Sequence, residues 1–169
     1  MTTELMKRRR FLSNLWKTGA AFIAGAGAWT TWDLINPLPS TGFGGVIRAV
    51  KPEVVTEGGV VEVATARSYL VRVDDEVIAL SQKCTHLGCR VPFCESSGQF
   101  ECPCHGSVFN RGGDHVKGAA PRGMDFFAVE IGDDGLVYID TGHSIDGNPP
   151  GTSTVDAPPI GPRCTEEAH

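Results

Sequence analysis

Short apolar runs separated by turn residues fill the middle and late parts of the chain. The runs rich in β-branched and aromatic residues are 60–66, 69–73, 77–81, 126–131 and 136–140. Between them lie stretches such as Glu57-Gly58-Gly59 and Asp133-Asp134-Gly135, which favour turns. Strands of about five residues at this spacing predict a mainly β fold, an antiparallel sandwich or a barrel-like domain.

One long stretch interrupts this pattern. Residues from about 82 to 124 show little regular hydrophobic periodicity. A loop region of this length in a compact domain is usually functional or organised by something other than peptide. We therefore expect an inserted subdomain at 82–124 within a β domain at 48–141.

The N-terminal part has a different pattern. Residues 18–32 carry no charge and consist mainly of Ala, Gly and aromatic residues. With its flanks, this segment is about 18–20 residues long, the lower limit for a helix that crosses a bilayer. Five basic residues precede it: Lys7, Arg8, Arg9, Arg10 and Lys17. Because the next basic residue is Arg48, the positive-inside rule predicts a single transmembrane helix at 15–35, with residues 1–14 in the cytoplasm. The alternative is a disordered basic tail before a buried helix.

Segments rich in Pro and Gly flank the β domain. Residues 36–47 hold two prolines, which stop a helix, and then Gly42, Gly44 and Gly45. They predict either a flexible hinge or an ordinary linker. Residues 142–169 are rich in Pro, Gly, Ser and Thr. They favour a loose tail over a segment that wraps around a partner.

The charge distribution excludes one class of partner. The net charge of −5 conceals an asymmetry, because the chain from Pro37 onward holds ten basic and eighteen acidic residues. A nucleic-acid-binding surface needs clustered positive charge. We therefore expect no nucleic-acid partner.

The candidate chemistry is concentrated in two short motifs, CTHLGC at Cys84–Cys89 and CPCHGS at Cys102–Ser107. They offer two thiolates and two imidazoles as metal ligands: Cys84, His86, Cys102 and His105. Such a set suits tetrahedral zinc, and it also suits a 2Fe–2S cluster in which two histidines replace two cysteines on one iron. A zinc site leaves Cys89 and Cys104 without a role, whereas the cluster interpretation has a use for one further cysteine in each loop.

The two motifs resemble the cluster loops of Rieske iron–sulfur proteins, specifically those of quinol-oxidising cytochrome bc and b/f complexes. The resemblance extends to GAAPR at Gly118–Arg122, which is similar to the family's proline loop, and to DDGLVYID at Asp133–Asp140. RRRFL at residues 8–12 resembles a twin-arginine export signal. The resemblance implies a Rieske domain with a cluster-binding insert, joined to an N-terminal transmembrane helix.

Carried over position by position, the resemblance assigns roles to the motif residues. It implies that Cys84 and Cys102 bind one iron of a single 2Fe–2S cluster, and that His86 and His105 bind the other iron near the surface. The remaining roles that it implies are a disulfide between Cys89 and Cys104, a hydrogen bond from Ser107 to a cluster sulfur, and a docking tip at Leu87 and Gly88.

The resemblance also implies a function. The chain would be the electron-transfer subunit of a quinol:cytochrome c oxidoreductase, a dimeric translocase in the bacterial inner (plasma) membrane. His105 would accept a hydrogen bond and a proton from quinol at a site shared with cytochrome b, and a c-type or f-type cytochrome would receive the electron.

Two other functions fit parts of the pattern. One is the Rieske small subunit of a periplasmic molybdenum oxidase of the arsenite-oxidising kind. The other is a soluble Rieske ferredoxin that serves an oxygenase, although such ferredoxins usually lack the disulfide pair and the anchor. The intact CTHLGC and CPCHGS motifs, with Leu87 and Ser107, favour the quinol-oxidising complex.

Four residues depart from the family pattern or lie outside it. Phe109 stands where high-potential members have a tyrosine that donates to a cluster sulfur, so we expect a lower potential, suited to menaquinol. Ala119 stands where the proline loop usually has a second proline. Cys94 and Cys164 belong to neither motif; they either pair with each other, or Cys94 is a small buried apolar residue.

Overall fold

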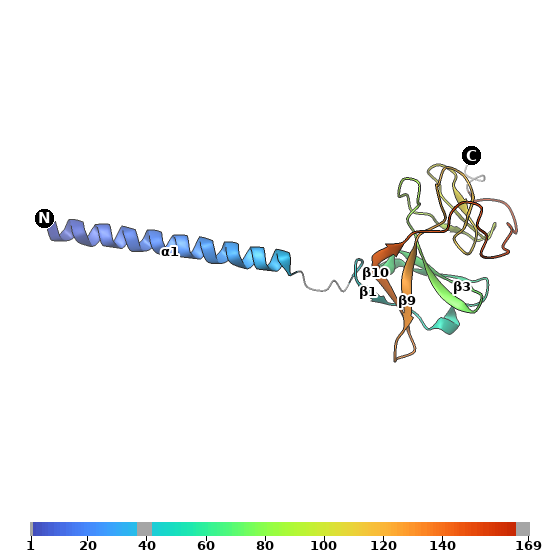
Figure 1. The fold of residues 1–169 in the computed structure, drawn as a ribbon, viewed down its shortest axis with the longest axis horizontal. Helices are drawn as coiled ribbons and strands as arrows, with labels where there is room; N and C mark the ends of the chain where they lie inside the picture. Colours follow the sequence, from blue (N-terminus) through green and yellow to red (C-terminus); the bar gives the residue numbers. More distant parts are fainter. Residues whose placement is uncertain (1, 37–41, 165–169) are drawn as a thin grey trace. The chain divides into compact units, whose positions relative to one another are not determined.

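The computed structural model describes residues 2–36 and 42–164 of the 169-residue chain. Residue contacts divide the chain into two units, residues 1–39 and residues 40–169. Helix α1 (Thr2–Ile35), blue in Figure 1, forms the first unit. Strands and two short 3-10 helices form the described part of the second unit: β1 (Val46–Arg48), η1 (Pro52–Val54), β2 (Val60–Val63), η2 (Ala64–Ala66), β3 (Ser68–Val73), β4 (Glu76–Ser81), β5 (Phe93–Cys94), β6 (Gln99–Glu101), β7 (Val108–Phe109), β8 (His115–Lys117), β9 (Phe126–Ile131) and β10 (Val137–Ile145).

Helix α1 includes the stretch at 15–35 that the sequence predicts to cross a membrane, but it begins much earlier. Its large apolar side chains, from Phe11 to Ile35, are exposed. Within residues 2–36 and 42–164, no helix combines the length and the mean hydropathy that a membrane span requires.

The second unit contains two antiparallel sheets. The larger sheet has six strands in the order β1-β10-β9-β4-β3-β2, and the smaller has four in the order β5-β6-β7-β8. The smaller sheet lies between β4 and β9 in sequence, within the predicted insert at 82–124. The expectation of a mainly β, antiparallel domain with an inserted subdomain is confirmed.

Two hydrophobic cores cover opposite faces of strand β3. Leu70 packs into a cluster with Ile47 of β1 and Val63 of β2, the two edge strands, so the larger sheet curves around this cluster. The neighbouring Tyr69 and Val71 point to the other face, as strand geometry requires. They pack there against residues of the insert: Val91, Phe100, Phe109, Cys84 and Cys102. Both candidate ligand cysteines are thus part of a hydrophobic core.

The predicted hinge at 36–47 is not free along its whole length. Its central residues, 37–41, lie outside the described residues. Gly44 donates its N–H to Thr141 Oγ1 at 2.8 Å, and the Thr141 N–H donates to the Gly45 carbonyl at 3.0 Å. Strand β1 then begins at Val46. Residues 44–47 therefore belong to the β domain, which corrects the predicted boundary.

The expectation of a loose tail over residues 142–169 is wrong for its described part. Strand β10 continues to Ile145, and further on the Ile160 N–H donates to the Ser97 carbonyl at 3.0 Å. A disulfide joins Cys164 to Cys94 of β5. Backbone hydrogen bonds and a covalent bond therefore hold this segment on the domain; residues 165–169 lie outside the described residues.

Candidate metal centre

The two cysteine motifs form loops with the same backbone hydrogen-bond pattern; we call Cys84–Cys89 loop 1 and Cys102–Ser107 loop 2. In each loop, the N–H of the first cysteine donates to the carbonyl five residues later, at 2.7 and 2.8 Å. A glycine four residues after that cysteine donates back to its carbonyl, at 2.9 and 3.1 Å. Gly88 and Gly106 have φ of 82° and 67°, a region that glycine adopts without strain. The spacing of cysteine and glycine thus explains why both motifs fold alike.

The first cysteine of each loop is a buried free thiol. Cys84 and Cys102 are 2% and 1% exposed, and both belong to the same hydrophobic core. Burial raises the pKa of the Cys84 thiol, the His86 backbone N–H lowers it by less, and the neighbouring Cys102 raises it further. An uncompensated thiolate is costly in such a place, so the pair suits a bound cation that stabilises the deprotonated form.

The two motif histidines lie against each other near the surface. The ring centroids of His86 and His105 are 4.7 Å apart, with an angle of 86° between the rings. His86 Nδ1 is buried and has no hydrogen-bond partner within the described part of the chain. A buried ring nitrogen without a partner is unfavourable unless it binds something else. Its lone pair, together with the exposed His105, completes a set of two sulfurs and two nitrogens. The residues therefore fit a metal group that takes this donor set.

A disulfide joins the two loops. Cys89 of loop 1 and Cys104 of loop 2 are bonded, which is the pairing that the resemblance implies. The sulfurs of Cys89, Cys102 and Cys104 lie within 4.8 Å of one another. This trio is not itself a metal site, because a disulfide offers no thiolate. Its proximity shows instead that the covalent link lies directly beside a candidate ligand.

A third segment, Gly118–Arg122, packs on both cysteine loops; we call it loop 3. A Cβ on Gly118 would lie 2.5 Å from Ser107 Cα, so loop 3 touches the backbone of loop 2. The Ala120 N–H donates to Ser107 Oγ at 3.0 Å. On the other side, Thr85 Oγ1 donates to the Arg122 carbonyl at 2.9 Å. Loop 3 thus bridges the two loops that carry the candidate ligands.

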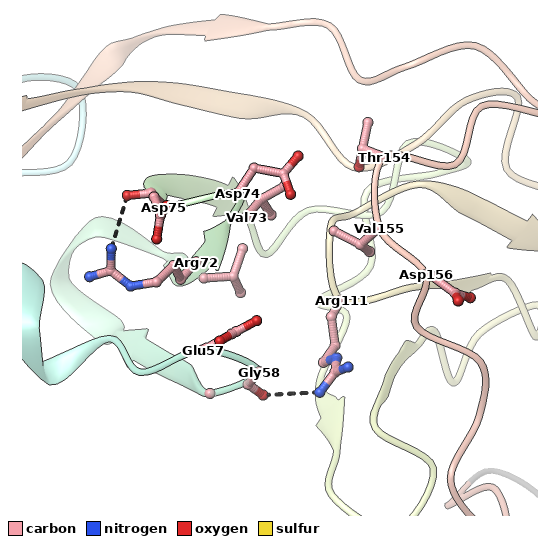
Figure 2. Close-up of a pocket in the computed structure, with 12 residues that line it drawn as sticks. Glu57, Gly58, Arg72, Val73, Asp74, Asp75, Arg111, Thr154, Val155 and Asp156 are labelled. Carbon is pink, nitrogen blue, oxygen red and sulfur yellow. Dashed lines mark hydrogen bonds between the residues drawn. The ribbon is translucent and has the colours of Figure 1, made fainter.

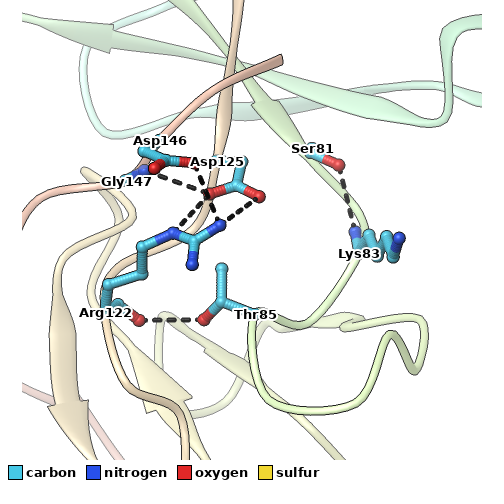
Figure 3. A network of polar contacts seen from close by, with 7 residues as sticks. All are labelled: Ser81, Lys83, Thr85, Arg122, Asp125, Asp146 and Gly147. Carbon is cyan, nitrogen blue, oxygen red and sulfur yellow. Dashed lines mark hydrogen bonds and ion pairs between the residues drawn. The ribbon is translucent and has the colours of Figure 1, made fainter.

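A polar network holds the end of loop 3 (Figure 3). The Arg122 guanidinium contacts both Asp125 carboxylate oxygens, at 2.9 and 3.2 Å, and Asp146 at 3.1 Å. The Gly147 N–H also donates to Asp125, at 3.0 Å. The carboxylates raise the pKa of Arg122 above its ordinary value, with Asp125 the largest cause. Loop 3 is therefore tied to the segment that follows strand β10.

Ser107 and Phe109 are both fully buried. Because Ser107 Oγ accepts from Ala120, its own proton remains available for a further acceptor. Phe109 lies in β7 and packs in the core that holds Cys84 and Cys102.

Leu87, the predicted docking tip, is 70% exposed between His86 and Gly88. A large apolar side chain this exposed beside the histidines offers a contact surface.

Asp114 is a buried carboxylate that the sequence analysis did not single out. It accepts hydrogen bonds from the Asn110 and Asn148 side chains and from both the N–H and the hydroxyl of Thr154. Burial alone would raise the pKa of Asp114, but these hydrogen bonds outweigh it and lower the pKa. The C-terminal segment is therefore attached at Asp114 as well as at Cys94.

A hollow of about 410 Å³ lies where the β3–β4 turn faces residues 154–156 (Figure 2). Asp74 and Asp75 line it from the turn, and Arg111 donates to the Gly58 carbonyl at its edge, at 3.4 Å. None of the candidate ligands contributes to its wall. We therefore place the chemistry at the loops and not in this hollow.

Sequence reasoning placed Thr85 and Arg122 in motifs without giving them a role, and it missed Asp125 and Asp114. Their partners are 37, 3, 22 and 40 residues away in the chain. Arg122 and Asp125 could have been noticed as an opposite-charge pair next to GAAPR. Asp114 carries no local signal beyond the Asn-x-Gly-Gly-Asp turn that contains it.

Comparisons with known proteins agree with this geometry. Residues 47–128 match the family model of the Rieske [2Fe-2S] domain. Iron–sulfur subunit 2 of the cytochrome b6-f complex from the cyanelle of Cyanophora paradoxa is 44% identical over 76 residues, which are 43% of this chain and 32% of that protein. The chloroplastic subunit of Volvox carteri is 40% identical over 77 residues, 44% of this chain and 37% of that protein. The chain thus spans about a third of the length of these curated relatives.

Among solved structures, the plasma membrane Rieske protein PetC3 from the cyanobacterium Synechocystis PCC 6803 aligns with 56% of this chain and 98% of its own. The identity is 24% and the TM-score 0.46.

Proposed function

Since residues 47–128 form a Rieske [2Fe-2S] domain, we propose that this chain is the electron-transfer subunit of a membrane cytochrome complex that oxidises a quinol. The observation that carries the proposal is the donor set within the matched residues, two buried free thiols and two imidazoles in contact. The similarity to iron–sulfur subunits of cytochrome b6-f complexes favours this kind of complex.

Four side chains would hold the cluster: Cys84 and Cys102 through thiolates, and His86 and His105 through imidazoles. When bound, the cluster supplies a one-electron acceptor. Its two neutral histidine ligands raise its reduction potential. The hydrophobic core around Cys84 and Cys102 excludes water from the thiolates. The Cys89–Cys104 disulfide and the contacts of loop 3 keep the two loops together.

His105 is the residue that meets the quinol. It is exposed, and its second ring nitrogen would accept a hydrogen bond from the quinol hydroxyl and hold the proton that leaves with the electron. Leu87, exposed on the adjacent loop, would contact an apolar surface of the cytochrome b subunit. The electron would pass on to a c-type or f-type cytochrome.

The chain would work at the bacterial inner membrane, in a dimeric translocase, with helix α1 as its attachment. The exposed apolar side chains of α1 need an apolar partner, and the basic residues before them favour the cytoplasmic side. Because Phe109 is buried beside the candidate ligand cysteines and has no hydroxyl to donate, menaquinol is a better substrate than ubiquinol.

The first test is the composition of the complex. The full chain is purified from membranes in a mild non-ionic detergent, and the co-purifying proteins are identified. We expect cytochrome b and the optical and EPR signature of a Rieske cluster. Recovery of a molybdenum subunit in place of cytochrome b would favour the arsenite-type oxidase.

A pair of histidine variants tests the site. His105→Gln should abolish the Rieske-type signal, since a ligand is lost. His143→Gln, an exposed histidine in β10, should keep it. Stoichiometric zinc without a Rieske-type spectrum, in cells with intact iron–sulfur assembly, would contradict the proposal.

A further inference from the structure

The segment just after strand β10 contacts the residues that directly follow loop 3 so closely that no side chain would fit between them. A Cβ on Gly147 would collide with the carbonyl oxygens of Gly123 and Met124. On one side of this contact, the Gly147 N–H donates to Asp125. On the other, the Gly123 N–H donates to the Asn148 carbonyl at 2.8 Å. Two hydrogen bonds and a backbone-to-backbone contact thus join residues 146–148 to residues 122–125.

Asp125 is the centre of this junction. Its side chain is 16% exposed and accepts from both Arg122 and Gly147. Arg122 gives a two-point contact to this carboxylate, a geometry that fixes orientation as well as distance. Asp146 adds a contact that is largely in water, and we assign it little weight. The segment therefore acts on loop 3 mainly through Asp125 and Arg122.

Loop 3 is hydrogen-bonded to both cysteine loops. The Arg122 carbonyl accepts from Thr85, the residue between Cys84 and His86. Two positions earlier in loop 3, the Ala120 N–H donates to Ser107 Oγ; this bond occupies one lone pair and leaves the Ser107 proton for another acceptor. Ala119 stands where the resemblance implies a second proline, so the backbone of loop 3 is less constrained by its own sequence.

We infer that Asp146–Asn148 is a C-terminal clamp that positions loop 3 on the two cluster loops, with Arg122 and Asp125 as positioning residues. The inference rests on the proposed function, since its consequence concerns a bound cluster. The clamp lies beyond residues 47–128, the part that matches the Rieske domain. It replaces, by tertiary contacts, the rigidity that a second proline would give to loop 3. It also orients Ser107, whose hydroxyl stabilises the reduced form of the group held by loops 1 and 2.

Two variants of the full-length holoprotein test the clamp without changing its net charge. Gly147→Ala inserts a methyl group between the two backbones. Arg122→Lys keeps the positive charge but loses the two-point contact. The controls are Gly42→Ala, where a Cβ meets nothing within 4 Å, and Arg48→Lys, whose Asp134 partner lies away from the loops.

The first readout is amide hydrogen exchange over residues 118–125. We expect exchange to be about tenfold faster or more in both variants, the factor for losing a charge-assisted hydrogen bond. The second readout is the midpoint potential and EPR spectrum of the assembled cluster. The potential should fall in both variants, because a loosened loop 3 no longer holds the Ser107 hydroxyl in place.

Unchanged exchange in Gly147→Ala and Arg122→Lys would overturn the clamp. Faster exchange with the potential and spectrum of the wild type would also overturn it, since residues 146–148 would then have a structural role only. Absence of a Rieske signal from the wild-type protein would instead sink the proposed function, and the exchange measurement would still decide whether residues 146–148 hold loop 3. If Gly147→Ala does not fold, Arg122→Lys decides alone.

Discussion

Phe109 lacks the hydroxyl that the resemblance to high-potential Rieske proteins implies at this position. Phe109→Tyr would restore a donor two residues after Ser107, in a strand that is completely buried beside both candidate ligand cysteines. If the ring edge points at a cluster sulfur, the new bond stabilises the reduced state more than the oxidised one. The midpoint potential should then rise by roughly a few tens of millivolts, a fraction of one charge-assisted hydrogen bond. A redox titration well below the histidine pKa values measures it.

The opposite outcome at Phe109 is equally specific. A tyrosine hydroxyl without an acceptor in this core would lower the free energy of unfolding by about 1–3 kcal/mol and leave the potential unchanged. Ser107→Ala serves as the matched comparison, and it should lower the potential. A potential that stays constant in Phe109→Tyr would remove the basis for preferring menaquinol.

The shape of the two cysteine loops was predictable from the sequence because the interactions that form it are local. Each motif carries its own turn, with a cysteine, a glycine four residues on and a histidine between them, so the loop geometry follows from six consecutive residues. The support of the site was not predictable in this way. Thr85 supports the site through its hydrogen bond to the Arg122 carbonyl, and these two residues are 37 positions apart in the chain.

At the scale of the elements, the two disulfides have different tasks. The Cys89–Cys104 disulfide spans 15 residues and joins loops 1 and 2. The Cys94–Cys164 disulfide spans 70 residues and attaches the C-terminal segment to strand β5. The chain-entropy argument assigns about 4 kcal/mol to a closed loop of the longer kind, as an upper estimate. Replacing both Cys94 and Cys164 by Ser should therefore lower the free energy of unfolding and expose residues 149–164 to proteolysis, while the Rieske spectrum remains.

The comparison variant replaces both Cys89 and Cys104 by Ser. It should lose less chain entropy, by the same argument, yet release the cluster readily. Denaturant unfolding, limited proteolysis and EPR of the two double variants separate these effects. Equal loss of the cluster in both would show that the C-terminal segment also supports the ligand loops directly.

Strand prediction worked best for runs of five or six residues. It overran β2, which ends at Val63, and stopped short of the end of β10 at Ile145. The runs at 69–73, 77–81 and 126–131 correspond to β3, β4 and β9 within one residue at each end. Strands of two or three residues in the insert escaped notice, because two residues show no alternation. The C-terminal segment, predicted to be loose, is held by hydrogen bonds to Asp114 and by a disulfide to Cys94. The composition of the segment itself indicates neither contact.

At the scale of the whole molecule, we expect the β unit to fold without helix α1 and we expect helix α1 to attach the chain to the membrane. The contacts that define residues 40–169 are internal to that unit. A chain of residues 40–169 should therefore fold with both disulfides and assemble the cluster. It should remain in the supernatant after a carbonate wash of membranes, whereas the full chain should stay with the membrane.

Either unexpected result in this fractionation is informative. If residues 40–169 also sediment with the membrane, an attachment lies in the β domain. If the full chain is washed off, helix α1 is not an anchor, and the proposed location fails while the site chemistry stands.

The closeness of the Cys102 sulfur to the Cys89–Cys104 bond also constrains the order of assembly. With three sulfurs within 4.8 Å, an unmetallated thiolate at Cys102 is placed to attack the disulfide and exchange partners with it. Such exchange would bury a ligand in a covalent bond and leave a non-ligand cysteine free. Occupying Cys102 with iron before the chain meets an oxidant removes the attacking thiolate. Under the proposed function, the order that avoids this exchange is therefore metal binding first and disulfide formation second.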